Sequence, residues 1–261
     1  MTETPPAIVS EQLETLILTW SADRVHVQLN RPEQHNAINR LMVDELHTVF
    51  DRVEREPRLL VLTGGDEGRF AAGADIAELR DRRLDDALAG INLSLFERLR
   101  ALPLPTIAAI DGPALGGGAE LAYACDLRIA TPRSSFGQPE VRLGIMAAAG
   151  GCFRLAELVG ESLAKELLFT GRSISAQEAR EAGLISRVVE PTELLVEAGA
   201  ICDQIARAST TALRLTKLAV NAPRAAHPAI DLAAQAVLFE TDEKFERMDA
   251  FLTRQRKRAE S

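Results

Sequence analysis

The sequence contains few cysteine and histidine residues, and they are not grouped. Its three cysteines, Cys125, Cys152 and Cys202, lie far apart and form no CxxC pair, so we expect neither a disulfide framework nor a zinc site. We interpret all three as reduced core residues, because free cysteine is commonly buried. The four histidines are scattered without metal-ligand spacing. No metal site is therefore predicted.

Long apolar runs and an excess of basic residues are also missing. No apolar run reaches the ~18 residues that a membrane span needs. Residues 1–10 are polar and contain proline, unlike a signal peptide, so we expect a cytoplasmic protein with no membrane partner. The net charge of −8 argues against a nucleic-acid partner, which requires a basic face. The motifs GxSxG, GxxxxGK[ST] and HExxH are absent, which argues against the enzyme classes that use them.

The residues that are present predict one sizeable core with a helical appendage. The chain has 261 residues, and 46% of them are hydrophobic. Alternating apolar residues predict strands over 13–20 and 24–30. The apolar period then becomes helical, with Asn39 as N-cap and Pro57 ending the helix. A long helical stretch is predicted over 193–258.

Three segments of the chain repeat one local pattern. Each contains a short buried strand, a glycine-bearing turn and a carboxylate, over 59–75, 106–120 and 127–140. Uneven repetition of this kind predicts a spiral of similar supersecondary units. Because the strands recur between helical segments, we expect mostly buried sheets in an α/β fold.

Two glycine-rich turns in these repeats are candidate binding elements. Gly116-Gly117-Gly118 and Gly73-Ala74 each precede a predicted helix, so their N–H groups lie at a positive dipole end. Glycines also allow a ligand to approach the backbone closely. Two convergent backbone donors would form an oxyanion hole. The alternative is that these tight turns serve packing alone. A single turn of this kind would favour that alternative, whereas two of them, each followed by a carboxylate, favour a binding site.

Glu120 and Glu140 follow glycine turns on successive repeats. Alone, Glu120 could merely complement a helix dipole, and Glu140 could be a solvated loop carboxylate. Together they suggest a general acid and base with pKa values shifted by their surroundings. The residues themselves therefore indicate an oxyanion hole with an acid–base pair, for a reaction they do not specify.

The same segments resemble a known family. FAAGADI at 70–76, ALGGGAEL at 114–121 and FGQPE at 136–140 are similar to signature segments of the crotonase (enoyl-CoA hydratase/isomerase) superfamily. The resemblance extends from about residue 13 to 258. It implies the crotonase (ClpP/crotonase-like) α/β spiral of ββα units with a helical C-terminal trimerisation region.

The resemblance also implies an organisation along the chain. We expect a flexible N-terminus over 1–12, a spiral core with the acyl-CoA site over 13–190, and a helical oligomerisation region over 191–261. A homotrimer or a dimer of trimers is implied, as is a role in fatty acid metabolism through β-oxidation.

The family's functional residues carry over onto this chain. The N–H groups of Ala74 and Gly117 would hold the thioester oxygen, and Glu120 and Glu140 match the two hydratase carboxylates. The implied contacts to substrate and CoA are Ala37, Ala72, Asp75, Ile76, Gly116 and Arg254. The pair of glutamates implies an enoyl-CoA hydratase that adds water reversibly, in syn fashion, to a trans-2-enoyl-CoA. No cofactor is implied, because CoA is part of the substrate.

Two alternatives stay open, and the chain departs from the family in two loops. A Δ3-Δ2-enoyl-CoA isomerase or another acyl-CoA lyase would need only Glu140 or a different pocket. A non-catalytic RNA-binding or scaffold member is the other alternative. In the CoA-facing loop, Gln34 and His35 replace lysine-type residues that are frequent in the family. Ala147 and Ala148 stand where the family usually has proline and glycine, at a backbone N–H that often helps to hold the catalytic water.

Overall fold

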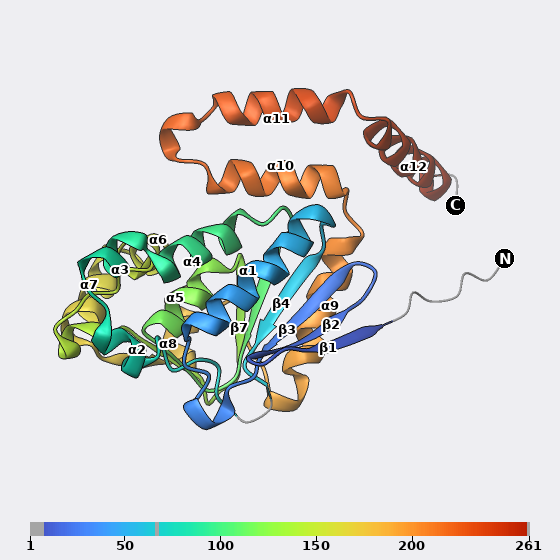
Figure 1. Cartoon of the computed structure of the whole chain (residues 1–261). Coiled ribbons are helices and arrows are strands. Elements are labelled where there is room, and N and C mark those ends of the chain that lie inside the picture. Colours follow the sequence, from blue (N-terminus) through green and yellow to red (C-terminus); the bar gives the residue numbers. More distant parts are fainter. Residues whose placement is uncertain (1–7, 66–67, 260–261) are drawn as a thin grey trace. The chain divides into compact units, whose positions relative to one another are not determined.

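The computed structural model describes residues 8–65 and 68–259, with side chains as far as 255. It comprises two compact units, Met1–Asp203 and Gln204–Ser261 (Figure 1). The boundary predicted from the sequence, at 190–191, lies upstream of this division. Each unit is described separately below.

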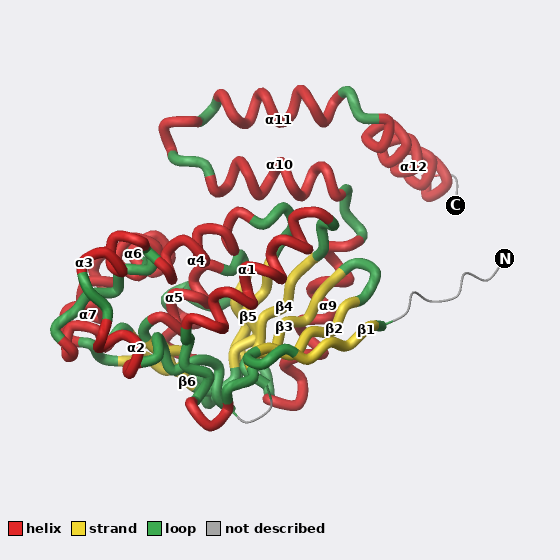
Figure 2. Tube along the Cα trace, viewed as in Figure 1, coloured by secondary structure: helices red, strands yellow, loops and turns green. Residues whose placement is uncertain are grey.

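The first unit is built on a seven-stranded sheet (Figure 2). In spatial order its strands are β1 (Val9–Gln12), β2 (Leu16–Trp20), β3 (Arg24–Leu29), β4 (Leu59–Thr63), β5 (Thr106–Ile110), β7 (Leu127–Ala130) and β10 (Arg187–Val188). The first three strands pair antiparallel, and the pairs from β3 to β10 are parallel. A smaller sheet contains β6 (Pro113–Leu115), β8 (Ser135–Gly137) and β9 (Ser173–Ser175).

Burial along the strands follows their position in the sheet. In β2, buried and half-buried residues alternate, as expected for an antiparallel strand with one covered face. Every residue of β4 and β5 is buried, as expected for parallel strands covered on both faces. The mixed α/β prediction is therefore confirmed.

Helices cover the sheets and connect the repeats. In the first unit they are α1 (Arg40–Arg55), α2 (Ile76–Asp81), α3 (Leu84–Ala89), α4 (Ile91–Ala101), α5 (Gly117–Ala124), α6 (Gly151–Val159), α7 (Glu161–Thr170), α8 (Ala176–Glu181) and most of α9 (Leu194–Ala206), in which the division falls. Asn39 caps α1 as predicted, because its side chain accepts a hydrogen bond from the Met42 N–H. The third repeat ends in a 3-10 turn, Pro139–Leu143, instead of an α-helix.

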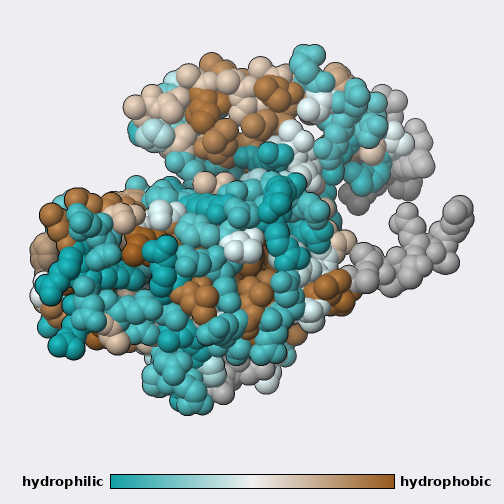
Figure 3. Space-filling model, in the orientation of Figure 1, coloured by the Kyte–Doolittle hydropathy of each residue, from teal (hydrophilic) through white to brown (hydrophobic). Residues whose placement is uncertain are grey.

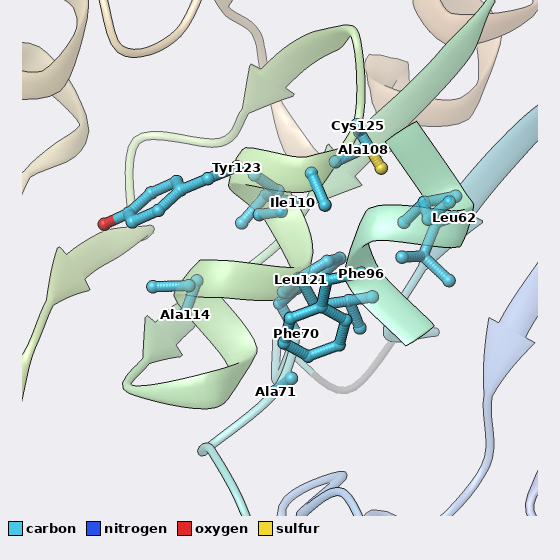
Figure 4. Close-up of a cluster of buried hydrophobic side chains, with 14 of the residues drawn as sticks. Leu62, Phe70, Ala71, Phe96, Ala108, Ile110, Ala114, Leu121, Tyr123 and Cys125 are labelled. Carbon is cyan, nitrogen blue, oxygen red and sulfur yellow. The ribbon is translucent and has the colours of Figure 1, made fainter. Parts of the chain in front are cut away.

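Helix α5 lies inside the core. All eight of its residues are buried. Figure 4 shows Leu121 of this helix beside Phe70 and Phe96, which are fully buried. Apolar side chains surround α5, and Glu120 in its first turn is the one charged residue of this buried helix. Apolar packing alone does not account for a carboxylate at this position.

Two expectations from the sequence differ from the structure. Residues 9–12 form β1 inside the segment expected to be flexible, although residues 1–7 lie outside the described part. Backbone pairing with β2 holds this strand, since most of its side chains are exposed. Cys125 and Cys202 are buried as expected, but Cys152, the second residue of α6, is exposed.

The second unit consists of helices. They are α10 (Thr210–Asn221), α11 (Ala229–Phe239) and α12 (Asp242–Ala259). Ser209 caps α10, and its hydroxyl also donates to the Glu243 carboxylate at the start of α12. In the described chain, no helix combines the length and apolar character that crossing a membrane requires.

Candidate active site

The two glycine-rich turns lie next to each other because the chain segments before them pair in parallel. Ala71 and Ala114 form a parallel bridge, in which the Leu115 N–H donates to the Ala71 carbonyl at 3.1 Å. On the other side, Ile38 bridges to Ala74 and donates its N–H to the Gly73 carbonyl at 2.8 Å. These bridges therefore bring together three segments that lie far apart in the sequence, around residues 38, 71–74 and 114.

The N–H groups of Ala74 and Gly117 converge in this arrangement. A Cβ atom placed on Gly117 would lie 3.3 Å from the Ala74 nitrogen, and one placed on Gly73 would lie 3.7 Å from the Gly117 nitrogen. Gly117 is the first residue of α5, so its N–H has no acceptor within its own helix. The two backbone nitrogens therefore lie close together, and their role as an oxyanion hole stays a prediction.

Gly116 has a backbone conformation that favours glycine, and it lies against the Glu140 carboxylate. Its φ of +51° lies in the left-handed region that side chains disfavour. A Cβ atom there would also lie 2.8 Å from Glu140 Oε1. The missing side chain thus allows the second carboxylate to approach the turn.

Glu120 is 3% exposed and faces a loop that follows the third repeat. Its Oε1 accepts hydrogen bonds from the N–H groups of Ala149 and Gly151, both at 2.8 Å. The pKa of Glu120 is raised to about 7, mainly by burial and also by the nearby Glu140, while the two backbone donors oppose the shift. The result is a carboxylate that changes protonation near neutral pH.

Glu140 is half-buried and lies in the 3-10 turn that follows Gln138. With its amide oriented to satisfy its surroundings, the buried Gln138 donates to both Glu140 carboxylate oxygens at 3.0 Å. Burial raises the pKa of Glu140 as well. Two carboxylates with raised pKa values that share one site are suited to acid–base catalysis.

Both carboxylates and both backbone donors line one cavity of about 560 Å³. Its lining residues are Ala72, Gly73, Ala74, Ile76, Leu79, Arg82, Arg83, Asp86, Ala87, Gly90, Ile91, Asn92, Leu93, Gly116, Gly117, Glu120, Pro139, Glu140, Leu143, Ile145, Met146, Ala148 and Ala149. Most of these side chains are apolar or absent, so the carboxylates face a largely apolar space, as is typical of small-molecule sites. In the part of the chain that the structure describes, no group of three or more His, Cys, Asp or Glu residues is placed to hold a metal ion.

The sequence model of the enoyl-CoA hydratase/isomerase family matches residues 22–258. The chain belongs to this family. A short-chain-enoyl-CoA hydratase of Clostridium acetobutylicum is 39% identical over 94% of this chain and 97% of its own length. A crotonyl-CoA hydratase of Syntrophomonas wolfei is 38% identical over 93% and 96%.

A solved structure confirms the predicted fold. The crystal structure of enoyl-CoA hydratase from Bacillus anthracis superposes with a TM-score of 0.87 at 35% identity. The superposition covers 92% of this chain and 97% of that one. The crotonase fold, and the α/β class that it implies, are therefore confirmed.

Only some of the other residues that the family resemblance assigned to substrate binding line the cavity. Ala72, Ile76 and Gly116 line the cavity, whereas Ala37 and Asp75 are not among its lining residues. Instead, Arg31 Nη1 donates to the Ala37 carbonyl at 2.5 Å and to Asp75 Oδ2 at 3.1 Å. These contacts link the loop that contains Ala37 to Asp75, the N-cap residue of α2.

Arg254 lies on α12 in the second unit, where its side chain is exposed. Its predicted contact with CoA phosphates stays a prediction, as does each substrate role assigned by family resemblance.

The loop with Ala147 and Ala148, where the family usually has proline and glycine, has a backbone conformation that does not need a glycine. Among the described residues other than glycine, only His35 and Asn36 have positive φ, so Ala147 and Ala148 have ordinary backbone conformations. Ala148 lines the cavity, and the next residue, Ala149, donates to Glu120. Two alanines therefore fit the backbone at this place.

Three residues that hold the carboxylates were not predicted from the sequence. They are Gln138, Ala149 and Gly151. Gln138 lies within the FGQPE segment, and its position two residues before Glu140 was an available signal. Ala149 and Gly151 contribute backbone N–H groups, which no side chain marks. Glycine at position 151 leaves room for Glu120, since a Cβ atom there would lie 3.0 Å from Glu120 Oε1.

The raised pKa of Glu120 predicts a pH-dependent effect of Glu120→Gln on stability. As pH rises from the ordinary carboxyl pKa of 4.5 to about 7, the unfolded chain loses a proton that the folded protein keeps, so the folded protein loses stability. Glutamine stays neutral. The difference in free energy of unfolding between Glu120→Gln and wild type should therefore move in favour of the variant by up to roughly 3 kcal/mol between pH 5 and pH 8. Denaturant unfolding at both pH values measures this gain, and an equal difference at both would contradict it.

Proposed function

We propose that this chain is an enoyl-CoA hydratase, which adds water reversibly to a trans-2-enoyl-CoA and forms a 3-hydroxyacyl-CoA. The observation that carries the proposal is the placement of Glu120 and Glu140 in one cavity with the N–H groups of Ala74 and Gly117. The names of the relatives from Clostridium acetobutylicum and Syntrophomonas wolfei support it and make crotonyl-CoA the first substrate to test.

The thioester carbonyl is the group that the backbone donors recognise. Its oxygen accepts hydrogen bonds from the Ala74 and Gly117 N–H groups, which withdraws electrons from the conjugated double bond. As water attacks the β-carbon, negative charge moves onto this oxygen as an enolate. Loss of one such donor typically lowers the rate by about 10²-fold or more.

The two carboxylates act on the water and on the α-carbon. Glu120, oriented by the Ala149 and Gly151 N–H groups, holds the water and removes its proton as the oxygen bonds to the β-carbon. Glu140, held by Gln138, also binds the water and supplies the proton that reaches the α-carbon. Both carboxylates line the same cavity, and in the proposed reaction they act from one face of the double bond, which makes the addition syn. The elements of one water molecule are added, and no group leaves.

Loss of enoyl absorbance from crotonyl-CoA tests the proposal directly. We expect turnover by the wild-type protein and formation of 3-hydroxybutyryl-CoA. Folded protein that hydrates no enoyl-CoA from short to long chains would contradict the hydratase function. Faster conversion of 3-enoyl-CoA into 2-enoyl-CoA than hydration would instead favour the isomerase alternative. Binding of RNA at physiological salt without turnover would favour the non-catalytic alternative.

We also propose that the second unit mediates a homotrimer or a dimer of trimers. Its helices expose large apolar side chains, visible as brown patches over α10 and α11 in Figure 3. They are Leu218, Val220, Leu232, Val237, Phe239, Phe245, Met248, Phe251 and Leu252. Such clusters of exposed apolar side chains are typical of protein–protein interfaces.

Light scattering coupled to gel filtration tests this assembly. We expect the mass of three or six chains for the wild-type protein. Leu232, which is 69% exposed, should tolerate methionine, whereas Leu232→Glu should increase the share of monomer by placing a charge in the interface. A monomeric wild-type protein, or a Leu232→Glu variant whose assembly has the same mass as wild type, would contradict the proposal that the second unit mediates assembly.

The proposed chemistry uses only side chains, backbone and substrate, so we propose that no metal or redox cofactor takes part. Cytoplasmic location, a role in β-oxidation and the absence of nucleic-acid and membrane partners stay predictions from the sequence.

A further inference from the structure

Asn92 is the one uncharged polar side chain among the residues found to line the cavity. It is the second residue of α4, and it is 9% exposed. Other cavity residues on this part of α4, Ile91 and Leu93, are apolar. An amide at this position therefore places a hydrogen-bonding group on an otherwise apolar wall.

The Asn92 amide lies close to the two backbone donors. Its Nδ2 atom is 3.6 Å from the point where a Cβ atom on Gly117 would lie, and that point is 3.3 Å from the Ala74 nitrogen. Helix α4 packs against α5, which brings the amide to the N-terminus of α5. Three N–H groups from separate segments, one before α2, one at the start of α5 and one on α4, therefore surround the same region of the cavity.

The other atom of the amide is unfavourable for stability. Asn92 Oδ1 is enclosed by protein and has no hydrogen-bond partner among the described residues. A buried acceptor left without a partner destabilises a fold, and leucine has nearly the same shape without this cost. Packing thus favours leucine here, and a requirement for the cavity-facing amide nitrogen accounts for asparagine.

We propose that Asn92 donates a third hydrogen bond to the carbonyl oxygen of the acyl thioester, and this inference rests on the hydratase function proposed above. Negative charge on that oxygen increases as the water oxygen bonds to the β-carbon. A donor fixed on α4 stabilises that charge more than it stabilises the neutral thioester, so it accelerates the chemical step. Asn92 is then a catalytic residue alongside the two backbone donors.

Asn92→Leu tests this role with crotonyl-CoA as substrate. We expect kcat to fall by about 10-fold or more, because one donor to the developing oxyanion is lost. The melting temperature should stay unchanged or rise, because the unpaired Oδ1 is removed together with the amide. Lower activity without lower stability separates a catalytic role from a packing role. Ser94→Ala, an exposed change on the same helix, should keep kcat within about two-fold.

A chromophoric ligand provides a second measurement that does not depend on turnover. The absorption of 4-(dimethylamino)cinnamoyl-CoA shifts to longer wavelength when its carbonyl oxygen accepts stronger hydrogen bonds. We expect a smaller shift on Asn92→Leu than on wild type when both are saturated. Asn92→Ala, which removes the amide without adding bulk, should also show the smaller shift and serves if the leucine variant does not fold.

The outcomes separate this inference from the hydratase proposal. Active wild-type protein together with an Asn92→Leu variant of equal kcat and equal spectral shift would overturn the role of Asn92 alone. Wild-type protein that hydrates no enoyl-CoA would overturn the hydratase function on which the role depends.

Discussion

Glu120→Gln is expected to lower kcat for crotonyl-CoA hydration by at least about 10²-fold, within the usual range for a general acid or base. Glutamine keeps the shape of the side chain, and its carbonyl oxygen can still accept the hydrogen bonds from Ala149 and Gly151. It cannot remove a proton from water. The fold should therefore survive while the chemical step slows, and steady-state kinetics with an unfolding curve would show both.

Two further variants test whether the loss of activity is specific to the two carboxylates in the cavity. Glu140→Gln should cause a loss of at least similar order, about 10²-fold, because it removes the proton donor to the α-carbon. Glu157→Gln, an exposed change on α6, should keep kcat within about two-fold. If Glu120→Gln and Glu140→Gln both retained nearly wild-type activity, these carboxylates would have no place in the mechanism.

Gly118→Ala is expected to destabilise the protein by about 3 kcal/mol or more, the upper range for overpacking a core. A Cβ atom on Gly118 would lie 2.1 Å from the Ala71 carbonyl oxygen and 2.7 Å from the Ala71 Cβ. Neither neighbour is a flexible side chain, since both belong to the segment that pairs with residues 113–115. Helix α5 would have to move, and its movement would displace the Gly117 N–H and Glu120 together.

Denaturant unfolding measures the cost of Gly118→Ala, and hydration kinetics on the remaining folded protein measures the displacement. Gly199→Ala is the matched control, because Gly199 lies in α9 with negative φ and its added Cβ would approach no closer than 4.0 Å to Arg24 Nη1. Alanine there should be neutral or stabilise the fold by up to about 1 kcal/mol. A Gly118→Ala variant as stable as this control would show that the turn and the neighbouring segment are not in tight contact.

The repeats and the site residues within them were predictable because each depends on local sequence. Asn39 caps α1, and the apolar run of β4 is buried throughout, as composition and periodicity indicated. Ala74, Gly117, Glu120 and Glu140 all lie at the ends of such units and all line the cavity. Local patterns were sufficient to select the two glutamates and the two glycine-rich turns, and the family resemblance singled out Ala74 and Gly117 within those turns. Parallel pairing of the units brought these residues together.

The contacts that tune the site were less predictable because they join segments far apart in the sequence. Glu120 is held by backbone groups 29 and 31 residues away, and no side chain marks those groups. Asn92 carries no motif, and its importance appears only when α4 packs beside α5. Strand β1 was missed for a related reason, since pairing with β2 stabilises it more than any pattern of its own side chains.

Hydration of a trans-2-enoyl-CoA in D₂O tests the central claim most directly, because it reports on both carboxylates in one product. The account predicts a 3-hydroxyacyl-CoA with one deuterium at the α-carbon, on the same face as the new bond between the β-carbon and oxygen. Proton NMR coupling between the two carbons reads this configuration. Addition of water and deuterium to opposite faces, or no addition at any chain length, would contradict it.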